Sequence, residues 1–269
     1  MPRRSNADAP EQGGYSIRAV QRVCDLLDLL QREPGGASLA RAAEVTKLPK
    51  SSAFRYLVTL EERRYVERDP ATGDYRLGLA LLPMQARQLD VLTRRARPYL
   101  DRLQAEFGET ANLGLLDGNR VVYLDIVESP HAMRLVASRG DRDPLHSTAL
   151  GKAIAAQLPD DRIRAILRAE GMPKHTDRTL TTQRDYLAQL DVVREQGYAV
   201  DDEENEVGAR CVGVALPSEN LPLAISVAGP AARLTSERVP EIAQRLQTAA
   251  YELAAELGMV DAAVAVGSR

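Results

Sequence analysis

The order of elements near the start of the chain constrains the fold more than any other feature of the sequence. Apolar residues recur at helical spacing over 17–33, 39–47 and 52–64, which predicts three short helices. Two alternating runs over 65–77 then predict a β-hairpin. Three helices followed by a hairpin are the pattern of a winged helix-turn-helix, and we assign this domain to residues 15–78.

Turn and capping residues support these boundaries. Ser16, Ser38 and Ser51 stand where the three helices should begin, and serine is a good N-cap. A Pro-Gly-Gly run ends the first helix, and Pro49 follows the second. The hairpin turn is predicted at 70–73, Pro-Ala-Thr-Gly.

The predicted third helix has a polar face suited to the major groove of DNA. At about 100° per residue, apolar and hydrogen-bonding side chains separate onto opposite faces. The apolar face comprises Phe54, Leu57 and Val58, and the polar face comprises Ser52, Tyr56, Thr59 and Arg63, with Arg55 at its edge. Such a helix is also common as a plain amphipathic surface helix, but the helix, turn, helix and hairpin order favours DNA binding.

Phosphate contacts are expected from the start of this helix and from the hairpin. Lys50 precedes backbone N–H groups that suit a phosphate, and the hairpin carries two arginines. The predicted DNA-binding residues are Lys50, Ser51, Ser52, Arg55, Tyr56, Thr59, Arg68 and Arg76.

The remainder of the chain predicts a linker helix and an α+β domain. Helical spacing returns over 79–107 with Pro98 interrupting it, which indicates a linker helix over 79–94 and then a docking helix. Mixed strands and helices follow, in a domain assigned to 95–260. Strands are predicted within 110–129, on both sides of an Asp-Gly-Asn turn, and over 133–140, 198–203, 209–217 and 222–229; helices are predicted over 147–158, 160–171, 183–197 and 236–258.

Charge and composition restrict the class of protein. The chain has 269 residues, enough for two domains, and no apolar stretch that could span a membrane. Residues 1–98 carry 17 Lys and Arg against 12 Asp and Glu, whereas the whole chain has a net charge of −3. A basic front half fits a partner that is a polyanion. Residues 1–14 are expected to form a flexible arm without a secretory signal, and 261–269 a flexible tail.

Neither a metal site nor an active site is predicted. Cys24 and Cys211 lie far apart, and His131, His146 and His175 share no metal-ligand spacing; with the absence of a secretory signal, this indicates a protein of the reducing cytoplasm. His146, Ser147, Lys152, Asp201 and Cys211 could supply a nucleophile and a base, but no local nucleophile motif accompanies them. We therefore expect no enzyme and no cofactor. A small-molecule sensor and a pure protein-interaction domain remain as alternatives for the second domain.

Five blocks of the sequence resemble successive signatures of the IclR family of bacterial transcriptional regulators. They are YSIRAVQRVCDLLDLL, LPKSSAFRYLVTLEERRYVERDPATGDYRLG, HSTALGKAIAAQL, GYAVDDEENEVGARCVGVALP and AISVAGPAARLT. The resemblance covers about residues 15–258 and implies a winged helix-turn-helix, a linker helix and a GAF-like domain that binds a small molecule. It also implies dimers or dimers of dimers. Two features depart from the family: Arg64 replaces the usual glycine before the wing, and the loop SENLP is short.

The resemblance also implies an effector pocket. The matching positions are Leu135, Ala149, Leu150, Asp201, Cys211 and Ser226, and the opening of the helix at 147–151 adds the backbone N–H of Thr148. Small residues at that opening let a carboxylate approach the unpaired N–H groups, or simply allow the helix to pack closely on a sheet. Asp201, if ionised, accepts hydrogen bonds and repels a second carboxylate.

These observations predict a DNA-binding regulator, most simply a repressor. Its partners would be a pseudo-palindromic duplex operator and a small hydroxylated acid such as a sugar acid, or a neutral sugar. An activator of the same architecture is the alternative, because the sign of regulation depends on where the operator lies. The protein is expected in the cytoplasm as a homodimer or homotetramer.

Overall fold

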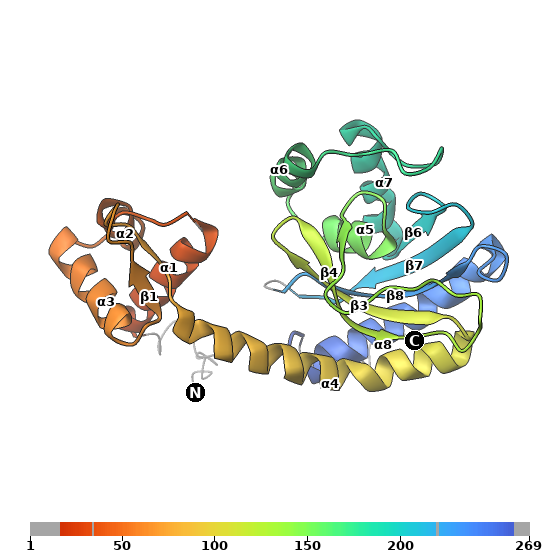
Figure 1. Cartoon of the computed structure of the whole chain (residues 1–269), viewed down its shortest axis with the longest axis horizontal. Coiled ribbons are helices and arrows are strands. Elements are labelled where there is room, and N and C mark those ends of the chain that lie inside the picture. The colour runs from red at the N-terminus through yellow and green to blue at the C-terminus, as the bar shows by residue number, and fades with distance from the viewer. Residues whose placement is uncertain (1–16, 34, 219–220, 261–269) are drawn as a thin grey trace, which may run out of the picture. The chain divides into compact units, whose positions relative to one another are not determined.

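A computed structural model describes residues 17–33, 35–218 and 221–260. The expected arm, the Ser16 cap and the tail lie outside these residues. The chain divides between Gln88 and Leu89 into two compact units. Three helices and a hairpin make up most of the first, and the second is an antiparallel sheet with helices on both faces, so the α+β class is confirmed (Figure 1).

The first unit contains the winged helix-turn-helix expected from the sequence. Its elements are α1 (Arg18–Arg32), α2 (Leu39–Thr46), α3 (Lys50–Glu62), β1 (Val66–Arg68), β2 (Tyr75–Leu77) and the short 3₁₀ helix η1 (Leu79–Leu81). The antiparallel strands β1 and β2 form the wing. Buried side chains from all three helices and the wing form one core, which includes Leu26, Leu30, Leu57 and Tyr75. Helix order and hairpin position therefore match the prediction.

Two of the three predicted caps can be compared with the structure. Ser38 caps α2, because its hydroxyl accepts a hydrogen bond from the Arg41 N–H at 3.2 Å. The Ser51 cap is wrong: α3 begins two residues earlier than predicted, at Lys50, and Pro49 occupies the N-cap. Pro49 has an extended ψ of 144°, and its carbonyl accepts the first helical bonds, from the N–H groups of Ser52 and Ala53. Proline's fixed φ thus starts the helix without a side-chain cap.

The turn between α3 and the wing is tight. Arg64 has a φ of +59°, in the left-handed region that glycine occupies at little cost. Gly78 packs against the same turn, since a Cβ there would lie 2.2 Å from the carbonyl oxygen of Arg64. The Arg64 oxygen also accepts the N–H of Ala80 at 3.1 Å. The departure from glycine at position 64 therefore leaves a strained backbone where wing and helix meet.

Pro98 does not interrupt the following helix, contrary to the prediction. Helix α4 (Leu82–Phe107) is continuous through it. Proline removes one helical hydrogen bond, but α4 buries Leu92, Ala96, Leu100 and Leu103 against the second unit. Burial of an apolar stripe offsets one lost bond, since each buried leucine contributes roughly 1.5–3 kcal/mol.

The second unit is built on a six-stranded antiparallel sheet of order β5-β4-β3-β8-β7-β6. The strands are β3 (Thr110–Asp117), β4 (Arg120–Val127), β5 (Arg142–Pro144), β6 (Ala199–Asp202), β7 (Ala209–Ala215) and β8 (Leu223–Pro230). The helices are α5 (Ala149–Ala156), α6 (Asp160–Glu170), α7 (Gln183–Gln196) and α8 (Val239–Glu256), which the 3₁₀ helix η2 (Ser236–Arg238) precedes.

One predicted strand is wrong. Residues 133–140 do not join the sheet, and β5 follows them instead. The Ser138 N–H donates to the Asp141 carboxylate at 2.7 Å, and Gly140 has a φ of +91°. These features fold the segment into a turn, so the alternating side chains that suggested a strand have no neighbouring strand.

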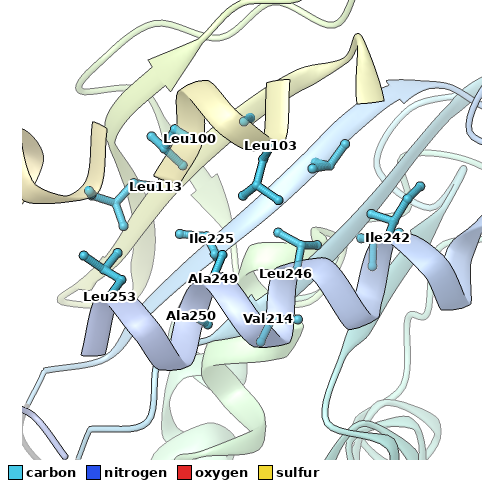
Figure 2. Packing of buried hydrophobic residues seen from close by; sticks show 14 of the residues in the cluster. Leu100, Leu103, Leu113, Val214, Ile225, Ile242, Leu246, Ala249, Ala250 and Leu253 are labelled. Atoms are coloured by element: carbon cyan, nitrogen blue, oxygen red, sulfur yellow. The ribbon is translucent and has the colours of Figure 1, made fainter. Parts of the chain in front are cut away.

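The sheet separates two apolar cores. On one face, α4 and α8 bury Leu100, Leu103, Leu246 and Leu253 against β3, β7 and β8 (Figure 2). On the other face, α5, α6 and α7 form a second cluster around Ile154. The continuous apolar run of β8 follows from this arrangement, because both faces of that strand are covered.

Replacing the strained residue before the wing should stabilise the protein. We expect Arg64→Gly to raise the free energy of unfolding by about 1 kcal/mol, because glycine adopts a positive φ without the steric cost. Arg63→Gly is the matched control, since Arg63 has a φ of −90° and gains nothing from glycine. Urea unfolding of the three proteins measures the difference, and equal gains from both variants would exclude backbone strain as the cause.

Candidate DNA interface and effector pocket

Helix α3 presents a different apolar face from the one predicted. Ala53, Leu57 and Leu60 point into the core, whereas Phe54 is 42% exposed. The sequence pattern predicts that Phe54 is the buried residue in this turn of the helix. Ala53 is buried there instead, and its small side chain lets the helix pack close to its neighbours. Assigning Phe54 to the buried face is therefore wrong.

The outward part of α3 carries the predicted DNA-binding side chains. Lys50, Ser51, Arg55 and Thr59 are exposed, and Ser52 and Tyr56 are half-buried. Ser52, Arg55, Tyr56 and Thr59 border a groove of about 530 Å³ that Val20 and Val23 of α1 complete. The Thr59 hydroxyl is already used within the helix, donating to the Arg55 carbonyl at 2.8 Å.

The wing arginines have internal partners. Arg68 Nε donates to the Gly73 carbonyl at 3.2 Å, and the guanidinium lies 5.7 Å from the centre of the Tyr75 ring. Arg76 Nε is 3.8 Å from Glu67 Oε2 across the hairpin. Both side chains therefore stabilise the wing, and Arg76, more than half exposed, remains accessible to a phosphate.

In the second unit, all seven predicted effector positions line one cavity of about 190 Å³. It lies between the N-terminal end of α5 and the sheet. Sequence reasoning missed several polar residues in the same lining: Thr110, Asn112, Tyr123, Asp141, Asp143, Asn205 and Glu206. The described residues of the short SENLP loop are not among the lining residues.

Strand register explains why these residues meet. Thr110, Ala228, Cys211 and Asp201 lie opposite one another in a row across β3, β8, β7 and β6. Asn112, Ser226 and Gly213 form the next row on the same face. Alternate residues of a strand share a face, so the register brings every polar group of both rows to the cavity side.

Asn112 supplies an unsatisfied polar group. Its side-chain nitrogen donates to Ser226 Oγ at 3.2 Å, while its Oδ1 has no hydrogen-bond partner among the described residues. Asn112 is 3% exposed. A buried acceptor without a partner costs about 1–3 kcal/mol, and a ligand hydroxyl in the cavity could satisfy it.

Two buried carboxyl groups give the cavity its electrostatic character. Burial raises the pKa of Asp201 to about 6, although Lys152 and the N–H groups of Glu204 and Asn205 favour its ionised form. Burial also raises the pKa of Asp143, which accepts the Tyr123 hydroxyl at 2.8 Å.

Cys211 lies beside these acids. Burial, and then the nearby charges of Asp201 and Asp143, raise the pKa of its thiol. No lysine or arginine lines the cavity in the described part of the chain.

The start of α5 closes the cavity opposite the acids. Thr148 is the N-cap, and its hydroxyl accepts the Gly151 N–H at 3.1 Å. Among the described residues, the N–H groups of Ala149 and Leu150 have no acceptor. The helix also packs tightly, because a Cβ at Gly213 would lie 2.7 Å from the Ala149 carbonyl oxygen. The small residues at the start of α5 therefore serve close packing on the sheet and also leave N–H groups free at the cavity.

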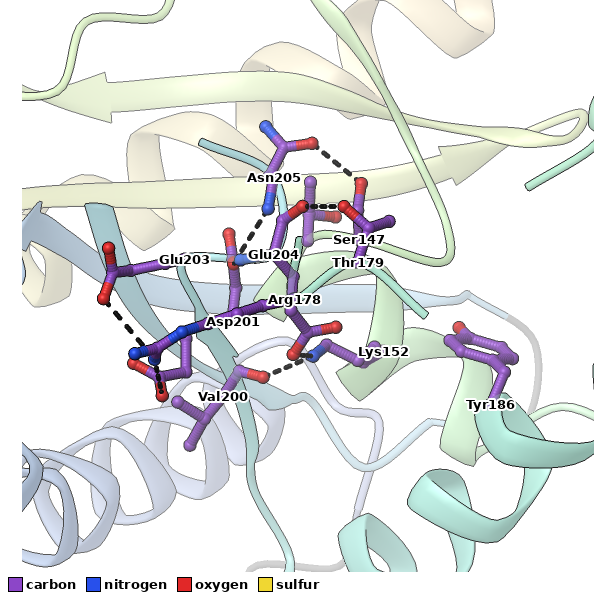
Figure 3. A network of polar contacts seen from close by, with 12 residues as sticks. Ser147, Lys152, Arg178, Thr179, Tyr186, Val200, Asp201, Glu203, Glu204 and Asn205 are labelled. Carbon is purple, nitrogen blue, oxygen red and sulfur yellow. Dashed lines mark hydrogen bonds and ion pairs between the residues drawn. The ribbon is translucent and has the colours of Figure 1, made fainter. Parts of the chain in front are cut away.

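A polar network supports the acidic side of the cavity (Figure 3). Lys152 is fully buried, and its Nζ lies 2.5 Å from both Glu204 Oε1 and the Val200 carbonyl. Ser147 Oγ donates to Asn205 Oδ1 at 2.7 Å. Ser147 and Lys152 are therefore engaged in the support of the loop after β6 and not arranged as a nucleophile and its base.

The histidines do not form a metal site. His146 is buried, its pKa is lowered by burial, and its Nε2 lies 3.1 Å from the Pro173 carbonyl. His175 stacks on it, with ring centres 5.6 Å apart. In the described residues, no cluster of His, Cys, Asp and Glu could hold a metal ion.

Comparison with known proteins identifies the family. A family model described as the bacterial transcriptional regulator IclR C-terminal domain matches residues 85–255, and the IclR helix-turn-helix domain model matches 19–70. The chain belongs to the IclR family. The resemblance drawn from the sequence blocks is thereby confirmed.

Characterised relatives extend over most of the chain. The HTH-type transcriptional regulator KdgR of Escherichia coli (strain K12) is 34% identical over 263 residues, covering 96% of this chain and 98% of KdgR. The HTH-type transcriptional repressor AllR of the same strain is 31% identical over 247 residues, covering 90% and 91%. The crystal structure of Thermotoga maritima IclR has a TM-score of 0.61 at 32% identity, over 89% and 98% of the two chains.

The protein is accordingly a transcriptional regulator with a helix-turn-helix, and not an enzyme. None of the helices that the structure describes has the length and apolar content needed to cross a bilayer.

The raised pKa of Asp201 should make stability depend on pH. Its pKa in the folded protein, about 6, exceeds the unfolded value, so the stabilising contribution of the protonated carboxyl is lost as the pH rises through about 6. Asp201→Asn stays neutral. The free energy of unfolding of the variant relative to wild type should therefore increase by about 2 kcal/mol from pH ~4 to pH ~7.5.

Urea unfolding at the two pH values measures this change. Asp202→Asn is the control, because Asp202 is exposed and pairs with Arg178 at 2.6 Å and Arg210 at 2.5 Å. Removing that carboxylate should destabilise the protein at neutral pH. A pH-independent effect of Asp201→Asn would contradict the assignment of a raised pKa.

Proposed function

We propose that this regulator is a repressor whose operator binding is controlled by a small hydroxylated acid bound in the cavity of the second unit. The observation that carries the proposal is the cavity itself. It is lined by Asn112, whose buried Oδ1 has no hydrogen-bond partner among the described residues, and by Ala149 and Leu150 of α5, whose N–H groups have no acceptor there. A domain that only bound other proteins would need no such polar groups. The name of AllR as a repressor supports the sign of regulation.

The DNA contacts are proposed for α3 and the wing. Lys50 stands in the first turn of α3, where a cation and free N–H groups suit a phosphate. Arg55 is exposed on the same helix and forms no ion pair with the described residues, and an arginine in the major groove reads guanine edges. Ser51, Ser52, Tyr56 and Thr59 flank it, and Arg68 and Arg76 would reach the backbone beside the groove.

The effector chemistry follows from the two ends of the cavity. A carboxylate suits the N–H groups of Ala149 and Leu150 at the positive end of α5. Hydroxyl groups suit Asn112 Oδ1, Ser226 and Asp201, which accept hydrogen bonds. Asp143 and Asp201 disfavour a second carboxylate, because like charges repel in a buried site. Leu135 and Leu150 contact a short apolar stem, and Cys211 leaves little room beside it.

One recognition helix reads only a few base pairs in a single major groove, so a specific operator needs two such helices on two half-sites. We therefore propose a homodimer, or a tetramer of two dimers, on a pseudo-palindromic site in the cytoplasm, where the chromosome lies. An activator of the same architecture is the second candidate. The position of the operator relative to the promoter decides between repression and activation, and AllR supports repression only by analogy.

Substitutions in α3 should separate base reading from phosphate binding. Arg55→Ala should weaken binding to the operator by about 1–3 kcal/mol and relax specificity at one base pair. Lys50→Ala should weaken binding to all duplexes alike. It should also reduce the slope of log affinity against log salt concentration by about 1, because one phosphate contact is lost. Operator duplexes selected from a random pool, titrated at several salt concentrations, provide the measurement.

Arg32→Ala, at the end of α1, removes the same charge outside α3 and serves as the control. It should leave base preference unchanged. If Ser52, Arg55 and Tyr56 can be replaced together without loss of operator affinity, α3 is not the recognition helix.

Three six-carbon probes should test the effector chemistry. D-Gluconate should bind the cavity, whereas hexanoate lacks the hydroxyl donors and D-glucitol lacks the carboxylate, and each should bind at least about tenfold more weakly. Asp201→Asn should weaken D-gluconate binding while leaving operator binding intact. Calorimetric titration of wild type and variant measures both effects.

Filling the cavity provides a second test. Leu150→Trp, or Ala228→Leu from the opposite strand, should abolish D-gluconate binding, with circular dichroism confirming the fold. Equal affinity in wild type and in a folded, filled variant places the ligand elsewhere, and tighter binding of hexanoate overturns the chemical argument.

A further inference from the structure

One wall of the cavity is a segment without regular structure, residues 133–141. Leu135, Val136, Ala137 and Asp141 line the cavity. The segment is anchored near both ends: Thr110 Oγ1 donates to the Leu135 carbonyl at 3.1 Å, and the Tyr123 N–H donates to the Asp141 carbonyl at 3.1 Å. The turn at 138–141 is held as well, by the Gly140 N–H on the Tyr123 carbonyl at 2.9 Å and by the Ser138 N–H on the Asp141 carboxylate at 2.7 Å, so movement of this wall is easiest at residues 136 and 137.

Arg139 lies in that turn, two residues after Ala137, and its side chain reaches the other face of the sheet. Its guanidinium binds the carboxylate of Asp125, whose side chain is 2% exposed. Asp125 pairs in register with Leu113, a residue of the core beneath α4 and α8. Tyr123, only two residues earlier, pairs with Gly114 and lines the cavity.

An irregularity in the strand makes this possible. The register of β4 shifts between Leu113 and Gly114, leaving Leu124 as an extra residue. A bulge of this kind redirects the side chains that follow it. Consequently β4 presents Tyr123 to the cavity and Asp125 to the opposite core.

A second arginine reaches the same carboxylate from α4. Arg97 Nη1 lies 3.4 Å from Asp125 Oδ1, the oxygen that Arg139 also contacts. Arg97 Nε is held by Asp101 at 2.9 Å. Helix α4 has residues in both compact units, because the chain divides between Gln88 and Leu89, within the helix. Arg97 is thus on the chain segment that leads to the DNA-binding unit.

The charged side chains of Arg139, Arg97 and Asp125 are unequally exposed. This difference allows two states of the Arg139–Asp125 contact, closed and open. The side chains of Arg139 and Arg97 are 60% and 43% exposed, whereas that of Asp125 is 2% exposed. Arg139 can move into water at little cost, but a buried carboxylate left with fewer partners pays a large desolvation penalty. When Arg139 leaves, Asp125 therefore attracts Arg97 more strongly, and the present 3.4 Å separation leaves room to close.

We propose that Asp125 transmits effector binding from the cavity wall to α4. A ligand that displaces residues 135–137 moves Arg139 off Asp125, and Arg97 then closes on the carboxylate and shifts α4. Allosteric coupling requires such a two-state element that both sites bias. The inference rests on the proposed function, because it assigns the route by which the cavity controls DNA binding.

Arg139→Gln should reproduce the effector-bound state of the protein without any effector. Using full-length protein and the duplex selected by wild type, we expect about tenfold weaker operator binding. In an Asp125→Asn background the same substitution should change operator affinity less than about twofold, because the coupling carboxylate is gone. Asn keeps the acceptor that now receives the Ile126 N–H at 2.8 Å, so the strand should remain folded.

Arg134→Gln is the matched control. Arg134 lies on the same wall segment but pairs with the exposed Glu128 at 2.9 Å. It should leave operator affinity unchanged. Wild-type affinity in Arg139→Gln, or an equal loss in the Asp125→Asn background, overturns the proposal.

Amide hydrogen exchange gives a readout that needs neither operator nor effector. Arg139→Gln should slow exchange of α4 residues 93–101 by about threefold, although no hydrogen bond or ion pair joins Arg139 to the described residues of that helix, and Asp125→Asn should remove this effect. A change confined to residues 133–141 shows a purely local role and rejects the coupling. If no duplex is bound by wild type, the proposed function fails, while the exchange result still decides the coupling.

Discussion

The antiparallel register of β3, β8, β7 and β6 is the constraint on which the second unit depends. Neighbouring residues of a strand face opposite ways, so a slip of one residue would exchange the two faces. The row of Thr110, Ala228, Cys211 and Asp201 would then enter the apolar core, and leucines would enter the cavity. The cost of burying those polar groups without partners fixes the register, and the register fixes the site.

The same constraint distributes charge between the two faces. The cavity face holds carboxyl groups with no lysine or arginine among the described lining residues, whereas Asp125 on the opposite face is held by two arginines. Glu109, buried at the end of the sheet, is likewise paired, with Arg233. Among the described residues, the buried acids of the opposite face and of the sheet's end are thus paired with arginines, whereas Asp143 and Asp201 of the cavity have no cation among the lining residues.

Local sequence patterns predicted most helices and strands. They missed features that depend on tertiary contacts, namely which residues face the cavity, which face of α3 is buried and whether α4 continues through Pro98. Helices and hairpins followed from apolar spacing and turn residues, the family resemblance indicated six of the seven cavity positions, and the start of the predicted helix at 147–151 indicated Thr148. Asn112 and Tyr123 were missed because only the strand register, including the bulge at Leu124, shows that they share the cavity face. Phe54 was misplaced because helical periodicity cannot tell which of two adjacent apolar stripes, that of Ala53 or its own, is pressed inward. The continuity of α4 through Pro98 likewise depends on burial that spacing does not reveal.

Gly213 has a consequence for how such a cavity can change. The first turn of α5 rests on the hydrogen atom of this glycine, since a methyl group would lie 2.7 Å from the Ala149 oxygen. The depth of the cavity is therefore set by backbone resting on backbone. Exchange of the lining side chains can alter which functional groups are recognised, but the separation of helix and sheet at Gly213 changes only when the helix itself is lifted.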